Sequence, residues 1–450
     1  MTPSPGNLLE ALSRRARLMD DANRHVVLVL VGNALRLVLG LASSAMLARG
    51  LGPEGLSSFS VVSAAMLIAI TTSDLGLSNS AVRYLALDLQ EQPSRALRTG
   101  KIFANLKLLG CISVVILSVM MAGPLATLLG LPAESGRQLV YLAALGVLAT
   151  SCSGVVSTIL RALRRFPHLV ATQTLNFSLT VLLLGALYVN GRLTIASALL
   201  VGAVTALAAA IGGWSLLPPV WRRTLRSRAP LAGADDAAAD DDHAIGRRLW
   251  RFGRWLWVSN FLVIALSQLD LLLLNRWASA EATGYYALAL NLSLKAAVLN
   301  QTLHTVLLPS VSSLNGWDQF VAYARHSLLR SALLAAVLLL ALPLARPFIV
   351  IVYGASYAPS VSLFYLLIGV AIFEILVDPL LMLAYPLNMA RHIAASYVVR
   401  VAIMLLAGGL IIPSSGGFGA ALAKLAANVL GALFLGSLLL LRLRRIRQTA

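Results

Sequence analysis

Runs of about 20 mostly apolar residues recur along this chain and constrain its fold more than any other feature. A run of that length crosses the hydrocarbon core of a bilayer as a helix, which satisfies its own backbone hydrogen bonds. Charged residues make up only 12% of the chain. Soluble domains carry about 25%, so this chain cannot cover a water-exposed surface. We predict an all-α integral membrane protein.

The apolar runs form two sets of six, about twelve in all, separated by charged residues and by Gly or Pro breaks. The first set lies near 26–48, 55–77, 102–122, 138–160, 169–189 and 193–217. The second set lies near 252–275, 284–308, 327–345, 359–384, 393–412 and 418–440. This pattern predicts two six-helix bundles.

The chain accordingly divides into five segments. A basic, amphipathic stretch over 1–25 precedes a first bundle over 26–217. The Ala- and Asp-rich linker 218–251 has no periodicity and is predicted to be disordered. A second bundle over 252–440 is followed by a basic tail over 441–450.

Basic residues outnumber acidic residues, and the formal net charge of the chain is +18. If the spans alternate in direction, most Lys and Arg residues flank the membrane on the side of the N-terminus. The positive-inside rule then places both termini in the cytoplasm, as expected of a multi-pass protein in the inner membrane of a bacterium. Because the charge flanks spans, we expect a lipid bilayer as the partner, and no nucleic acid.

The two halves resemble each other at one place. "ARGLGPEGLSSFSVVSAAML" follows the first span and "NRWASAEATGYYALALNLSL" follows the seventh, each with Glu five residues after Arg. This match suggests a duplicated bundle. Repeats with an even number of spans run parallel, related by an axis along the membrane normal.

Ionisable residues inside the spans are the candidate functional groups, because a charge in hydrocarbon is costly and usually faces a wet or protein-lined interior. By depth, Arg36, Lys295 and Glu374 lie near the middle, Asp270 and Lys424 in the outer half, and Lys107, Asp378 and Arg400 in the inner half.

Cations outnumber carboxylates in this set. A cavity shared by both halves would be net positive and attract an anion such as a phosphate or pyrophosphate. We predict that Arg36, Lys295, Lys107, Arg400 and Lys424 bind the substrate there. The alternatives are a structural ion pair for Arg36 and snorkelling to the surface for Lys107 and Lys424.

Glu374 and Asp378 are four residues apart, so they share one face of a helix. They either pair with Arg400 or, together with Asp270, take up H⁺ or Na⁺ to drive transport. The sequence contains no P-loop, no HExxH, no GxSxG and no metal-spaced Cys/His set. We therefore expect no enzyme, no metal and no cofactor apart from a coupling ion.

Several segments resemble Wzx-type polysaccharide flippases of the MATE/MOP exporter superfamily. "LARGLGPEGLSSFSVVSAAMLIAITTSDLGLSNSAVRYLA" is similar to the first two spans of that family, and "RFGRWLWVSNFLVIALSQLDLLLLNRWASAEATGYYALALNLS" to its seventh and eighth. "LLPSVSSL", "VYGASYAPSVSLFYLLIG" and "SSGGFGAALAKLAANVLG" follow in family-like order.

The resemblance implies two six-helix bundles that form a V and alternate between inward- and outward-open states. It implies flipping of an undecaprenyl-pyrophosphate-linked oligosaccharide for O-antigen, capsule or exopolysaccharide biosynthesis, beside a polysaccharide polymerase machinery. Arg36 and Lys295 then hold the pyrophosphate. The alternative function is ion-coupled export of cationic drugs by the same superfamily.

Overall fold

A computed structural model describes residues 5–132, 134–227, 236–312, 316–387 and 389–449. Within these ranges, side chains are described for 31–132, 134–227, 242–295, 311, 316–387, 389 and 391–444. The described backbone is helical and contains no strand. The all-α prediction is therefore confirmed for the part of the chain that the structure describes.

Eight helices precede the middle of the chain. They are α1 (Pro5–Asp74), α2 (Leu77–Glu91), α3 (Pro93–Met120), α4 (Ala122–Leu128), α5 (Gly136–Ala162), α6 (Phe166–Val189), α7 (Ile195–Leu216) and α8 (Pro219–Arg226). The remaining helices are α9 (Asp236–Trp277), α10 (Ala280–Ser312), α11 (Trp317–Ala341), η1 (Leu342–Leu344), α12 (Ala345–Tyr353), η2 (Ala355–Tyr357), α13 (Ser360–Leu381), η3 (Met382–Ala384) and α14 (Ala390–Thr449).

Nine helical stretches of the described residues are long and apolar enough to cross a membrane. A glycine breaks the helix in two of them: Gly52 interrupts α1 with φ 67°, and Gly416 interrupts α14 with φ 53°. Glycine suits these positions because it adopts positive φ without a steric penalty. The side chains of 296–310 in α10 lie outside the described set, so the count of twelve spans stays a prediction.

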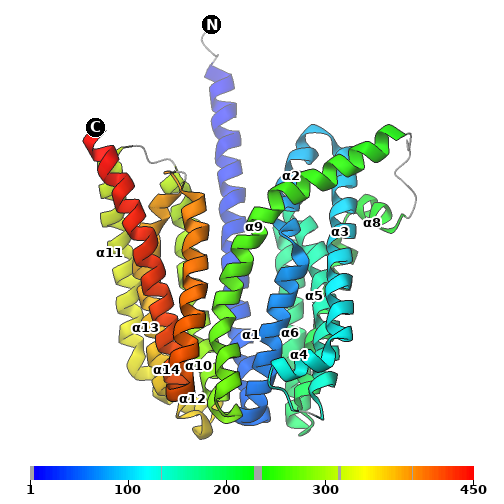
Figure 1. The fold of residues 1–450 in the computed structure, drawn as a ribbon. Helices are drawn as coiled ribbons and strands as arrows, with labels where there is room; N and C mark the ends of the chain where they lie inside the picture. The colour runs from blue at the N-terminus through cyan, green and yellow to red at the C-terminus, as the bar shows by residue number, and fades with distance from the viewer. Residues whose placement is uncertain (1–4, 133, 228–235, 313–315, 388, 450) are drawn as a thin grey trace.

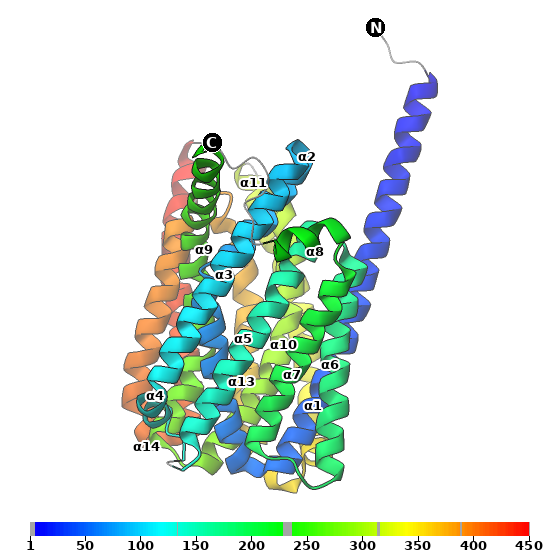
Figure 2. The same ribbon diagram turned by 90° about the vertical axis from the view of Figure 1, so that its right-hand side faces the viewer.

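The helices form two groups that lie side by side (Figure 1). One group contains α2 to α8, where α5 packs against α3 and α7, as Figure 2 shows from the side. The other contains α10 to α14. Helices α1 and α9 run between the groups, with α1 packed against α6 and α10 and α9 packed against α14. The start of α1 and the end of α14 both lie at the upper face in Figure 1, called here the terminal face.

The linker is more ordered than its composition indicates. The prediction of a disordered segment over 218–251 is wrong where α8 and the first part of α9 are helical. Apolar side chains explain the difference: Trp221, Ile245 and Leu249 are buried against the first helical group. Leu225 of α8 packs against the same core. The Ala- and Asp-rich composition of the segment conceals these few apolar contacts. Residues 228–235 lie outside the described residues.

Side chains tie α1 to the second group at the end opposite the terminal face. The Arg49 guanidinium donates to the carbonyl of Val352 at 2.9 Å, and the Tyr357 hydroxyl donates to the carbonyl of Ala48 at 2.9 Å. The backbones approach closely where Gly284 of α10 meets Pro53 of α1. These two residues lie in the two segments whose sequences match, so those segments contact each other directly.

We predict that Gly284→Ala weakens this junction. A Cβ atom at residue 284 would lie 1.9 Å from the carbonyl oxygen of Pro53, a backbone atom that cannot rotate away. Overpacking of this kind costs about 1–3 kcal/mol, so the melting temperature of the detergent-solubilised protein should fall by several degrees. Gly369→Ala is the control, because nothing lies within 4 Å of its Cβ position. Equal melting temperatures for the two variants would contradict the close approach.

Candidate functional site

A cavity of about 570 Å³, called here the polar cavity, lies among α9, α10, α13 and α14, with Leu67 of α1 at its wall. Four charged side chains line it: Glu374 and Asp378 from α13, and Arg400 and Lys424 from α14. The structure thus brings together four of the eight ionisable residues that the sequence singled out. Cations and carboxylates line the cavity in equal number, so the net positive charge expected from the sequence is not found in it.

Lys424 is held by a buried carboxylate. Its ammonium group lies 2.6 Å from Oδ2 of Asp270, which is fully buried on α9. The hydroxyl of Tyr286 donates to the same oxygen at 2.7 Å. A buried charge stays ionised only when a partner replaces its lost hydration. The ammonium of Lys424 occupies the place of a counter-ion beside Asp270, so Lys424 does not snorkel outward.

Arg400 is positioned by neutral groups. Its guanidinium donates to the side-chain oxygen of Asn428 at 3.1 Å and lies 5.3 Å from the ring centroid of Tyr397. Asn428 and Glu374 both line the polar cavity. The absence of a side chain at Gly431 makes room for the arginine, since a Cβ there would lie 2.1 Å from Cγ of Arg400. Asn428 and Gly431 therefore position Arg400 within the cavity wall.

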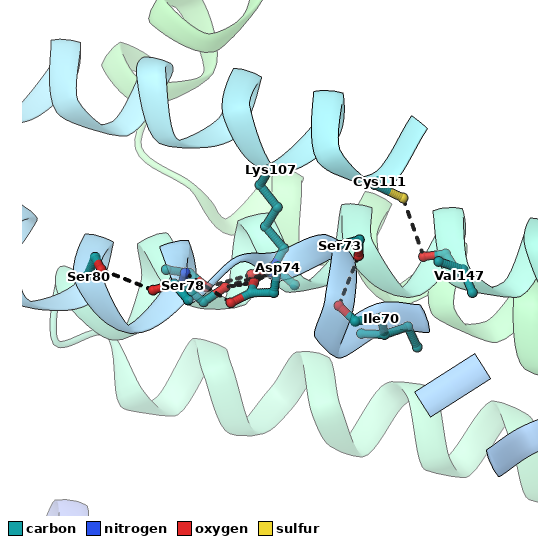
Figure 3. A network of polar contacts seen from close by, with 11 residues as sticks. Ile70, Ser73, Asp74, Ser78, Ser80, Lys107, Cys111 and Val147 are labelled. Atoms are coloured by element: carbon teal, nitrogen blue, oxygen red, sulfur yellow. Dashed lines mark hydrogen bonds and ion pairs between the residues drawn. The ribbon is translucent and has the colours of Figure 1, made fainter. Parts of the chain in front are cut away.

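Lys107 lies apart from this cavity. It reaches from α3 to the break between α1 and α2, where its ammonium contacts Oδ1 of Asp74 and Oγ of Ser78, both at 2.6 Å (Figure 3). Its side chain is only 8% exposed, so it does not snorkel. Because Asp74 neutralises it locally, the structure gives Lys107 a role in holding three helices together.

Arg36 lies on α1 facing α6. Its guanidinium donates to the side-chain oxygens of Gln173 and Asn33 and, at 3.2 Å, to the carbonyl of Gly32. All of these acceptors are neutral. Arg36 thus meets amide oxygens in place of the carboxylate expected for a structural ion pair, and amide oxygens orient a guanidinium without cancelling its charge.

Lys295 lies on α10 and lines a second cavity of about 440 Å³, called here the seam cavity, which is surrounded by α1, α10, α11, η1, α12 and α13. Its ammonium donates to the side-chain oxygen of Asn291. The rest of the described lining is apolar and includes Leu37 and Leu41. Cε of Lys295 lies 4.0 Å from the Cβ position of Gly40, one helical turn after Arg36. The mid-membrane cations of both halves therefore lie along the same α1–α10 seam.

Three polar residues of the site escaped the sequence analysis. Asn428, Tyr397 and Tyr286 contact the charged side chains directly. A signal existed for Asn428, since it follows Lys424 by four residues and so shares its helical face. The small residues Ala423 and Ala427 of the same segment are fully buried, as their spacing of four residues predicts for helix packing.

Comparisons with known proteins address the fold and the family. The sequence model of the family described as "Polysaccharide biosynthesis protein" matches residues 23–315, more than half of the chain. Two solved structures are each 13% identical in sequence to this chain. One is the inward-facing conformation of a multidrug resistance MATE family transporter of the MOP superfamily, with a TM-score of 0.66 over 92% of this chain and 96% of that chain.

The other is the lipid II flippase MurJ in an inward closed conformation, with a TM-score of 0.70 over 93% of this chain and 90% of that chain. Among curated proteins, no match is found. At such low identity the two structures show the fold alone. They confirm the predicted MATE/MOP-like architecture of a multi-pass membrane protein.

We predict that Lys424→Met destabilises the protein strongly, because it leaves the Asp270 carboxylate buried without a counter-charge. Breaking a buried pair from one side costs about 3–5 kcal/mol. The measurement is the thermal unfolding of the purified protein in detergent, with Asp270→Asn and the double variant studied in parallel.

The double variant removes both charges, so it should recover most of the stability that Lys424→Met loses. If the stability lost by the double variant equals the sum of the losses in the two single variants, the two charges do not form a direct pair.

Proposed function

We propose, because the chain belongs to the polysaccharide biosynthesis protein family, that it flips a lipid-linked oligosaccharide across the membrane for the synthesis of a surface polysaccharide. The substrate we propose is an oligosaccharide on undecaprenyl pyrophosphate, for O-antigen, capsule or exopolysaccharide. The family match and the transporter fold support a transporter in preference to an enzyme. The structure named as a lipid II flippase supports a lipid-linked substrate.

One observation carries the anionic part of this proposal. Arg36 and Lys295 lie on opposite halves, one turn apart along the α1–α10 seam, and their acceptors are the neutral oxygens of Gln173, Asn33, Gly32 and Asn291. Their charge therefore remains available to a ligand. Arginine binds phosphate oxygens with two parallel hydrogen bonds and lysine binds them as a point charge, so a pyrophosphate is the group that suits this pair.

The other cations contribute differently. Lys107 and Lys424 are paired with Asp74 and Asp270, and Arg400 shares its cavity with two carboxylates. We propose that Arg400 meets the substrate only after the helices rearrange, and that Lys107 and Lys424 act through the packing of their bundles.

Alternating access gives a direct mechanism for the flip. Hydrogen bonds of Arg49 and Tyr357 tie α1 to the second helical group at the end opposite the terminal face. We propose that this end faces outward and that the described conformation is closed to the outside. Neutralisation of Arg36 and Lys295 by the pyrophosphate would then let α10 move along α1. This movement would open the outer end and release the lipid into the opposite leaflet.

We propose that the terminal face lies in the cytoplasm of a bacterium, with the chain in the inner membrane, since the flanking basic residues follow the positive-inside rule. A polysaccharide polymerase acting on the flipped product is the proposed partner on the other side. Glu374 and Asp378 are the proposed sites of a coupling H⁺ or Na⁺, because Asp270 already has the ammonium of Lys424 as its counter-ion.

The first experiment deletes the gene in its native host and follows the lipid-linked oligosaccharides by mass spectrometry, with sidedness probed by an impermeant glycan label. Loss of the protein should trap the lipid on the cytoplasmic face. In the deletion strain, Arg36→Gln and Lys295→Gln should each transport at a rate about tenfold or more below that of wild type. The reason is that a hydrogen bond to a charged group contributes about 1.5–3 kcal/mol. Arg36→Lys should restore more than Arg36→Gln.

Arg346→Gln is the matched control, because Arg346 is exposed on α12 and contacts neither cavity. Full transport by a variant that lacks both Arg36 and Lys295 would show that these cations do not bind the substrate. An unchanged lipid-linked pool in the deletion strain, in a host without a second flippase, would refute the flippase itself. Drug accumulation in that strain would favour export of cationic drugs.

A separate prediction concerns energy coupling. If Glu374 and Asp378 carry the coupling ion, Glu374→Gln combined with Asp378→Asn should remove the dependence of flipping on an imposed ion gradient in proteoliposomes while substrate binding persists. Glu281→Gln is the control, since Glu281 is exposed at the start of α10. Gradient-dependent flipping by the double variant would locate coupling elsewhere.

A further inference from the structure

A third described cavity lies outside both sites discussed above. It has a volume of about 780 Å³, and α3, the break between α1 and α2, and the first part of α9 surround it. Its described lining shares no residue with the polar cavity or the seam cavity. A molecule bound there can therefore remain while a substrate moves between the bundles. This space is called here the α3–α9 groove.

The groove has an apolar wall and a polar mouth. Ile102, Leu106, Leu109 and Val114 of α3 form the wall. Twelve residues of helix separate the first of these from the last, which corresponds to about 18 Å at 1.5 Å per residue. One leaflet of a bilayer has a hydrocarbon depth of about 15 Å. The apolar wall is therefore about as long as an acyl chain that spans the hydrocarbon of one leaflet.

The mouth presents one face of α9. Asp242, His243 and Arg247 line it, followed by Trp250 one turn further on. The first three side chains are exposed, and Trp250 is 43% exposed. Tryptophan is enriched at the depth of lipid headgroups, so Trp250 marks the level at which the groove leaves the hydrocarbon. Charged groups of both signs therefore lie at headgroup level above an apolar wall.

We propose that the α3–α9 groove binds one resident phospholipid with a primary-amine headgroup, such as phosphatidylethanolamine. Arg247 and His243 bind its phosphate, the carboxylate of Asp242 accepts hydrogen bonds from its ammonium, and one acyl chain follows α3. The charge pattern favours this lipid over an anionic one, because the carboxylate would repel a headgroup without an amine. The inference rests on the membrane fold and does not depend on the substrate proposed above.

This lipid would contact a helix that both halves share. Ile245 and Leu249 of α9 are buried in the core of the first helical group, whereas the later part of α9 packs on α14. Next to the groove, Arg248 lies 3.3 Å from Oδ1 of Asp88 and 4.0 Å from the ring centroid of Tyr84 on α2. A lipid in the groove thus stabilises the position of α9 against the first group.

The test is native mass spectrometry of the full-length protein reconstituted in nanodiscs that contain phosphatidylethanolamine, phosphatidylglycerol and phosphatidylcholine, followed by release in detergent. Wild type should retain one phosphatidylethanolamine. Arg247→Gln should lower its retention by about tenfold, as expected for a lost charge-assisted hydrogen bond. Asp242→Asn should lower the preference for phosphatidylethanolamine over phosphatidylcholine, whose quaternary amine cannot donate a hydrogen bond.

Arg251→Gln is the matched control for the mouth, because Arg251 is exposed on the same helix but does not line the groove. A second pair tests the wall. Ser113→Trp should fill the groove and displace the lipid, whereas Ile116→Trp, exposed on α3 outside the groove, should not.

Equal retention by all variants would refute the site and indicate non-specific lipid around the protein. Preferred retention of phosphatidylglycerol would refute the amine-headgroup assignment.

Discussion

Every charge inside this chain's apolar helices needs a partner that the protein itself supplies, because the surrounding hydrocarbon offers none. Asp270 is matched by Lys424 and Asp74 by Lys107, each at 2.6 Å. These pairs join helices that are distant in sequence, so the demand for counter-charges also determines which helices pack together.

Against this background, Arg36 and Lys295 are different. Their described acceptors are neutral oxygens, so their positive charge is oriented but not cancelled. They also lie on opposite halves of the chain, along the seam between α1 and α10. In the mechanism that we propose, an anionic group bound there reduces the repulsion between these two cations and so links recognition of a charged lipid to a movement of the halves.

Helix α9 couples the two halves in a second way. Its first part is buried among the helices of the first half, and its later part carries Asp270, the counter-charge of the second half. Movement of one half relative to the other must bend or tilt this helix. The bulky Trp221 against Gly100 and the Arg248–Asp88 pair hold the surroundings of its first part at the terminal face. At the opposite end, the junction at Gly284 joins α10 to α1.

The sequence by itself determined the fold class, the two sets of spans and the candidate charges, because hydrocarbon length and the cost of a buried charge act on local composition. It did not determine which charges meet. That Lys424 neutralises Asp270, that Asn428 accepts a hydrogen bond from Arg400, and that Gly431 leaves space for this arginine are contacts between separate helical segments. Only the tertiary structure decided them, since a side chain's partner depends on how helices pack in three dimensions and not on its neighbours in the chain.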